Sequence, residues 1–183
     1  MIVFHKSVNK IVFTLALCLL SAGAQAQRTS SGQGMLSFEG QWPHGASVSA
    51  GGYLASSLWE AGAFAQWRCA HLDAYDMEYL PAAAFGDWMY RLCGTRSRAL
   101  NLYAGAGVFL GWEFFDPRGT LPETVLEETG SGVFLYGALA KIQLEIFFSR
   151  TVALILSGMA PFNFSSPYSW IEPVGTFGLR IDL

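Results

Sequence analysis

The sequence predicts an all-β fold, a closed antiparallel transmembrane β-barrel of eight strands. Hydrophobic residues make up 52% of the 183 residues and charged residues only 14%, whereas soluble domains average about 25% charged. Beyond the N-terminal leader, no run reaches the roughly 18 consecutive apolar residues that a membrane helix needs. Apolar residues instead occupy every second position, as in LNLYAGAGVFLGWEFF, residues 100–115. Successive strand side chains point to opposite faces, so such a segment has one apolar face and one mixed face.

The first 26 residues predict a cleaved secretory signal peptide of the Sec type, followed by one barrel domain over 27–183. Basic residues precede the apolar stretch 11–20, and Ala24-Gln25-Ala26 matches the small-x-small cleavage pattern. We therefore expect the mature chain to begin at Gln27 and to be exported to a bacterial outer membrane.

The N-terminal half of the mature chain predicts four strands, at 35–42, 47–55, 58–71 and 77–92. The first two are marginal in length, because a tilted membrane-crossing strand needs about 9–11 residues. The third alternates apolar residues from Trp59 to Trp67, and the fourth does so from Leu80 to Tyr90. Pro81 lacks an N–H for the strand ladder, so we expect a bulge or an edge-like irregularity there.

The C-terminal half predicts four more strands, at 99–115, 132–147, 151–162 and 170–183. The fifth is the alternating stretch quoted above; the sixth alternates around Leu144, the seventh around Leu154, and the eighth continues to the terminal Leu183. Most of the strands are longer than the 5–6 residues or so that are usual in soluble sheets. Lipid requires every backbone polar group to be paired, which a closed barrel achieves and an open sheet does not.

The connections predict an orientation with both termini in the periplasm. Outside loops are expected at 43–46, 72–76, 116–131 and 163–169, and periplasmic turns at 56–57, 93–98 and 148–150. Aromatic residues near strand ends predict two interfacial girdles. The outer girdle would hold Trp42, Trp112, Phe114, Phe162, Phe164 and Trp170, and the inner girdle Trp59, Trp88, Tyr90, Phe147 and Phe148.

Strand parity separates the side chains expected inside the barrel from those expected to face lipid. The interior of an eight-strand barrel is just wide enough for side chains to fill, so we expect cross-strand ion pairs and no open pore. The expected interior charges are Glu60, Arg68, Asp87, Arg91, Glu113, Lys141, Glu145, Arg180 and Asp182. The expected lipid-facing residues include Leu100, Leu102, Val108, Leu110, Ile142, Leu144, Leu179 and Ile181.

Charge and cysteine usage limit the possible partners. Loss of the leader leaves nine basic residues against fourteen acidic ones, and a nucleic-acid-binding protein would need a basic face. We therefore expect no direct nucleic-acid binding. Cys69 and Cys93 fall near opposite ends of a predicted hairpin, too far apart for the roughly 7 Å between Cα atoms that a disulfide allows.

A few polar clusters in the predicted loops are candidate sites. His71 lies near Asp73 and Asp76, and a His–Asp pair could support acid–base chemistry in an enzyme that modifies lipid; a solvated loop is the simpler interpretation, and the same holds for His44. The acidic loop residues Glu123, Glu127 and Glu128 match no calcium-loop spacing. Arg91, Arg96 and Arg98 gather at one periplasmic turn and could meet anionic lipid or a protein partner. No cofactor or metal site is expected.

The order of several segments resembles a known family. After a leader ending AQAQR come EYLPAAAFG, LNLYAGAGVFLGWEFF, VFLYGALAKIQLEIFFSRTVALIL and a final VGTFGLRIDL, an order similar to that of the conjugative-transposon TraO family. The resemblance implies a non-enzymatic outer-membrane component of a conjugative DNA-transfer apparatus, with membrane lipid and other transfer proteins as partners. The alternatives are an outer-membrane lipid-modifying enzyme with a site near His71, and a soluble lipocalin-like barrel with its apolar face inside.

Overall fold

The computed structural model describes residues 32–71, 76–95, 99–115, 132–166 and 170–183. The expected signal peptide, the acidic loop residues, Asp73, Arg96 and Arg98 lie outside the described residues. Within the described residues, no helix is long and apolar enough to cross a membrane.

The structure is built from β-strands alone across these ranges. The strands are β1 (Gly34–Trp42), β2 (Gly45–Leu54), β3 (Ser57–Gln66), β4 (Arg68–His71), β5 (Asp76–Gly94), β6 (Leu100–Phe115), β7 (Gly132–Phe147), β8 (Val152–Asn163) and β9 (Val174–Asp182). β3 and β4 are halves of one barrel strand, because both pair with β5 in a single antiparallel register: Ala65 faces Ala82 and Arg68 faces Tyr79. The nine segments therefore make eight barrel strands, as the sequence predicts.

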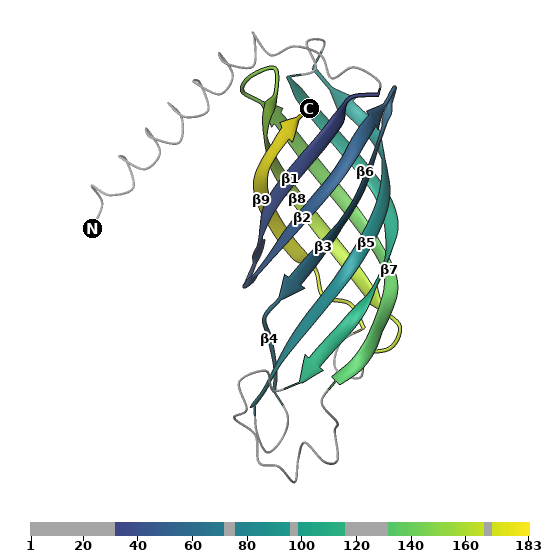
Figure 1. Cartoon of the computed structure of the whole chain (residues 1–183), viewed down its shortest axis with the longest axis vertical. Helices are drawn as coiled ribbons and strands as arrows, with labels where there is room; N and C mark the ends of the chain where they lie inside the picture. The colour runs from purple at the N-terminus through teal and green to yellow at the C-terminus, as the bar shows by residue number, and fades with distance from the viewer. Residues whose placement is uncertain (1–31, 72–75, 96–98, 116–131, 167–169) are drawn as a thin grey trace, which may run out of the picture.

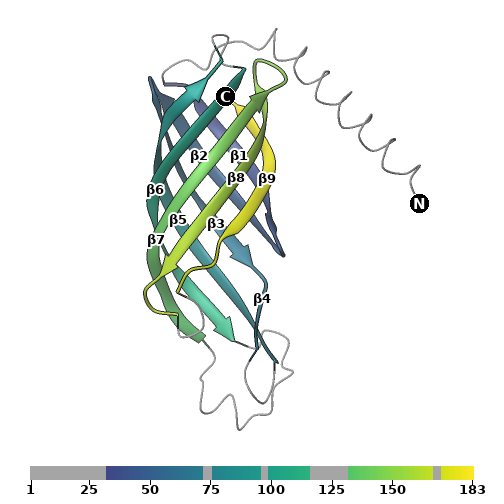
Figure 2. The ribbon, with the colours of Figure 1, turned by 180° about the vertical axis from the view of Figure 1, so that it is seen from behind.

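The sheet closes on itself. β1 pairs antiparallel with β2 on one side and with β9 on the other, where Phe38 faces Leu179. The backbone N–H of Leu183 donates to the carbonyl of Gly34 at 2.9 Å beside this seam. The front and rear views show tilted strands around the whole circumference (Figures 1 and 2). The prediction of a closed antiparallel barrel is confirmed.

The irregularity expected at Pro81 occurs on one side of its strand. Pairing between β5 and the β3–β4 strand is interrupted between the Ala65–Ala82 and Arg68–Tyr79 pairs. Pairing with β6 continues through Pro81, which faces Glu113. Proline removes one ladder donor, so its effect falls on the neighbour that needed that N–H. The register shift of β5 lies elsewhere, between Arg91 and Cys93.

At the end of the barrel away from the C-terminus, the strands on one side extend further than those on the other side. The β1–β2 hairpin ends part-way along the molecule, whereas β4 and the neighbouring β5, β6 and β7 continue beyond it (Figure 1). β9, the other neighbour of β1, begins only at Val174. The barrel wall is therefore shortest at β9, β1 and β2, and we call this the low side of the rim.

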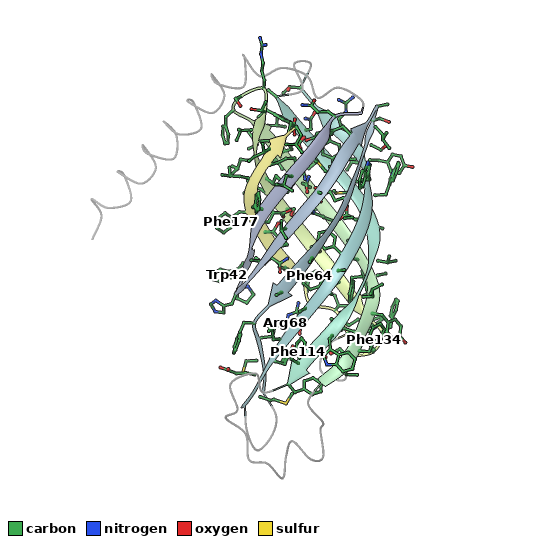
Figure 3. The ribbon with its side chains drawn as sticks, in the orientation of Figure 1. Trp42, Phe64, Arg68, Phe114, Phe134 and Phe177 are labelled. Atoms are coloured by element: carbon green, nitrogen blue, oxygen red, sulfur yellow. The ribbon has the colours of Figure 1, made fainter. Side chains whose placement is uncertain are left out.

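The outer wall is apolar. Outward positions of β6, β7, β8 and β9 carry uncharged residues throughout, and Val108 at 64% and Leu110 at 58% are among the most exposed side chains. Phe177 and Trp42 point away from the barrel while Phe64 lies within it (Figure 3). The eight residues expected to face lipid are all outward and at least partly exposed. This orientation is the reverse of a soluble lipocalin-like barrel.

One residue of the expected inner girdle is misplaced. Phe147 is fully buried inside the barrel, because its odd position on β7 shares the inward parity of Glu145. Phe148, one residue further along, is partly exposed. On the wall at the opposite end, Trp112, Phe134, Tyr136 and Phe164 form a chain of ring contacts with centroids 6.1–6.4 Å apart.

Glycines on the inward face let neighbouring strands approach closely. A Cβ at Gly105 would lie 2.0 Å from the carbonyl oxygen of Trp88, and one at Gly107 would lie 2.2 Å from that of Gly86. The close approach of β5 to β6 therefore requires glycine at these two places.

The cysteines lie at opposite ends of the barrel wall. Cys69 on β4 faces Glu78, whereas Cys93 near the end of β5 faces Leu102. Both are exposed and no disulfide bond joins them. Thiol titration of the unfolded mature protein should therefore report two reactive thiols per chain, and a value near zero would contradict this arrangement.

Replacing Val108 by Lys should destabilise the barrel in phospholipid vesicles by about 2–4 kcal/mol, because the charge would face the hydrocarbon near the middle of the wall. Denaturant unfolding monitored by tryptophan fluorescence measures the loss, with Val108→Leu as the size-matched apolar control. Equal stability of the two variants in vesicles would show that this face does not contact lipid.

Candidate functional site: a layered barrel interior

The interior side chains are arranged in layers. On β3, the inward-facing side chains include Leu58, Glu60 and Phe64, in that order. On β7, the inward-facing order is Phe147, then charged and amide groups, then Leu139. Charged groups therefore lie between two apolar clusters. The terminal cluster, next to the chain end, holds Met35, Tyr53, Leu58, Met89, Ala99, Tyr103, Phe147 and Ala153. The outer cluster, on the far side of the charges, holds Phe64, Ala83, Phe85, Phe109, Leu135, Leu139 and Met159.

Lys141 is one of two cations at the centre of the charged layer. Its Nζ lies 2.6 Å from Glu60 Oε2 and 3.6 Å from Glu39 Oε1. Asp87 Oδ2 is 3.9 Å away, and the Phe85 ring is 6.0 Å from Nζ on the outer side. A buried ammonium needs such partners, because isolated charge in a low-dielectric interior is very costly.

Arg180 is the second cation and is completely buried. Its Nη1 donates to Glu145 Oε1 at 2.6 Å, its Nη2 donates to Glu60, and its Nε donates to Ser37 Oγ at 2.8 Å. Glu60 therefore bridges the two cations. The guanidinium thus donates to side chains on three different strands, which fixes how those strands face one another.

Hydroxyl and amide groups complete the layer. The Tyr53 hydroxyl donates to Glu145 Oε1 at 2.6 Å, and Asn101 Nδ2 donates to Glu145 Oε2 at 3.3 Å. Ser157 Oγ donates to Glu39 Oε2 at 3.2 Å, and the Thr176 hydroxyl donates to the same oxygen. The carboxylates are thus held by neutral donors as well as by cations.

The charged layer has more carboxyl groups than cations. Five of them surround Lys141 and Arg180, namely Glu39, Glu60, Asp87, Glu145 and Asp182. Within the described part of the chain, both Asp87 oxygens and both amide atoms of Gln143 are buried without a hydrogen bond. The layer is therefore a polar region enclosed by apolar side chains on both sides, and none of the described residues form a group that could hold a metal ion.

The structure sorts the nine expected interior charges into three places. Six meet in the charged layer: Glu60, Asp87, Lys141, Glu145, Arg180 and Asp182. Arg68 and Glu113 lie instead at the end of the barrel beyond the outer cluster, where Arg68 pairs with Glu172. Arg91 is only partly buried, near the β5 bulge, and takes part in none of the ion pairs found among the described residues.

Sequence reasoning missed several interior groups. Glu39 is 6% exposed and contacts both Lys141 and Thr176, yet it was not among the expected interior charges. Its signal is present in the sequence, because Glu39 alternates with Leu36, Phe38 and Gly40 on one strand. Glu172 carried the same signal, because it shares the parity of Arg180 and Asp182 in the predicted strand 170–183, although β9 begins only at Val174.

The described residues do not test the histidine hypothesis. His71 ends β4 opposite Asp76, but their side chains and Asp73 lie outside the described part of the structure. His44 is exposed in the turn between β1 and β2, where its carbonyl accepts from the Trp67 N–H at 2.6 Å.

Solved structures share this fold. The N-terminal β-barrel domain of Pseudomonas aeruginosa OprF superposes with a TM-score of 0.51 at 13% identity, covering 84% of this chain and 98% of that domain. Neisserial surface protein A superposes with a TM-score of 0.53 at 13% identity, covering 82% and 94%. No protein-family model and no curated protein matches the sequence. At this identity the likeness establishes the fold alone: an outer-membrane-type, eight-strand β-barrel.

Replacing Arg180 by Met should destabilise the barrel by about 3–5 kcal/mol, because it leaves Glu60 and Glu145 buried without their cation. Equilibrium unfolding in detergent micelles measures the loss. Adding Glu145→Gln to Arg180→Met should recover part of it, since the second change removes one uncompensated charge. Additive losses in the double variant would show that the two side chains are not coupled.

Proposed function

We propose that this protein is a non-enzymatic outer-membrane β-barrel component of a conjugative DNA-transfer apparatus, with a closed interior. The placement in the outer membrane is supported by the uncharged outward wall of β6–β9 and by the likeness to the OprF and Neisserial barrels. The conjugative role is supported by the order of segments that resembles the TraO family.

The observation that carries the closed interior is its layering. Phe85, Asp87 and Met89 follow one another on β5 and belong in turn to the outer cluster, the charged layer and the terminal cluster. Each layer is packed from several strands, so two apolar plugs separate the charged layer from both ends. A barrel filled in this way acts through its ends, where loops and turns carry function.

Transport would require the plugs to open. The protein reconstituted in a planar bilayer should therefore show no large, stable single-channel conductance. Phe109→Ala and Leu139→Ala together should raise the conductance, because both side chains belong to the outer plug. A large conductance from the unchanged protein would overturn the closed interior.

An in-frame deletion of the gene in the native host should lower the frequency with which the conjugative element is transferred between cells. Expression of the intact chain should restore that frequency. The control is complementation with Arg150→Gln, a change in an exposed turn. Normal transfer by the deletion strain would contradict the conjugative role. Loss of a lipid-modifying activity in His71→Ala, with transfer unchanged, would favour the enzyme alternative.

A further inference from the structure

The low side of the rim contains a cavity of about 360 Å³. Its lining comes from Pro43 after β1, Gln66 of β3, Arg68 and Cys69 of β4, Tyr79 of β5, and the segment 171–174 before β9. We call this cavity the rim notch. It lies beyond the outer cluster and so is separate from the charged layer.

The rim notch opens toward the side of the barrel. The β1–β2 hairpin ends short of β4, which continues beyond its tip (Figure 1), and Pro43, Cys69 and Pro173 on the lining are exposed. Trp42, 74% exposed, precedes Pro43, and Trp170, 68% exposed, precedes Ile171. Figure 3 shows Trp42 at the tip of the hairpin, with Arg68 on the strand beyond it. Tryptophans on a membrane-facing wall favour the headgroup level, which places the notch at that depth.

Arg68 retains hydrogen-bonding capacity inside the notch. Its Nε donates to Gln66 Oε1 at 2.9 Å, its Nη2 donates to the same oxygen, and its Nη1 pairs with Glu172. A guanidinium carries five N–H donors, so one N–H on each Nη has no acceptor among the described residues. Guanidinium N–H groups are well suited to bind a phosphate.

A carboxylate, Glu172, lies beside Arg68 in the notch. The Glu172 side chain is 28% exposed and accepts from the Tyr79 hydroxyl at 2.8 Å as well as from Arg68. A carboxylate has about four acceptor sites, so capacity remains for an ammonium. Glu113, 1% exposed, interacts electrostatically with Arg68 but does not line the notch. The lining of the notch therefore presents one cation, Arg68, and one carboxylate, Glu172.

We propose that the rim notch binds the headgroup of a membrane lipid carrying both a phosphate and a primary ammonium group. Arg68 holds the phosphate, and Glu172 holds the ammonium. The acyl chains lie along the apolar outer wall, on the side of the notch toward the middle of the barrel. This inference rests on the proposed membrane placement and is independent of the conjugative role, because it requires only the folded barrel.

The two cysteines supply an internal comparison. Cys69 lines the rim notch, whereas Cys93 lies at the opposite end of the wall. The mature protein, folded in dodecylmaltoside micelles, is treated with a polar maleimide with and without phosphatidylethanolamine. The modification rate of Cys69 should fall several-fold with the lipid, while that of Cys93 stays unchanged. Equal slowing of both thiols, or no slowing, would overturn the proposal.

Lipid and protein variants test the chemistry. Phosphatidylglycerol lacks the ammonium, and the quaternary ammonium of phosphatidylcholine has no N–H to donate, so each should protect Cys69 less than phosphatidylethanolamine. Glu172→Gln, which lies outside the strand ladders, should remove the preference for phosphatidylethanolamine over phosphatidylcholine. Arg68→Gln should abolish protection by every phosphate lipid, and Arg150→Gln should leave it intact. Equal protection by the three lipids, or an unchanged preference in Glu172→Gln, would refute the assigned roles.

Discussion

The constraint on which the rest depends is that every backbone N–H and C=O group of the wall must be paired within the sheet. The outward positions of β6–β9 are uncharged, and lipid against such a wall offers the backbone no water to bind, so an open edge would be costly. The pairing of β1 with β9 removes that edge, with Met35 facing Asp182 at one end and Trp42 facing Gly175 at the other. Once the sheet is closed, strand alternation leaves only two environments for a side chain, the surroundings and the narrow interior.

The narrow interior then decides how charge is tolerated. Lys141 and Arg180 are buried, yet each contacts at least two carboxylates, and Glu60 joins them. The apolar clusters on both sides lower the local dielectric, which strengthens these pairs and raises the cost of losing one partner. The same packing that stabilises the network also fills the lumen, so stability and closure have a single physical origin. The rim notch lies where this packing ends. There the short β1–β2 hairpin leaves polar groups of the notch accessible from the outside of the barrel.

Most strands could be predicted because alternation is a local signal that tertiary contacts reinforce. β6 and β7 begin or end within one residue of the expected positions. The last strand begins at Val174 rather than 170, because Pro173 has no N–H for a ladder and Glu172 turns to pair with Arg68. The partners of the interior charges could not be predicted: Lys141 and Glu60 are 81 positions apart, and parity says which face a residue occupies but not which residues meet there.

The sequence by itself determined the fold class, the number of strands and which face of most strands is apolar, since each follows from periodicity within one segment. The tertiary structure decided how the interior is layered, which brought Glu39 to Lys141 and Tyr53 to Glu145 and set Arg68 and Glu113 apart at the rim. It did so because strand tilt and register, which no single segment encodes, fix the height of each inward side chain along the barrel.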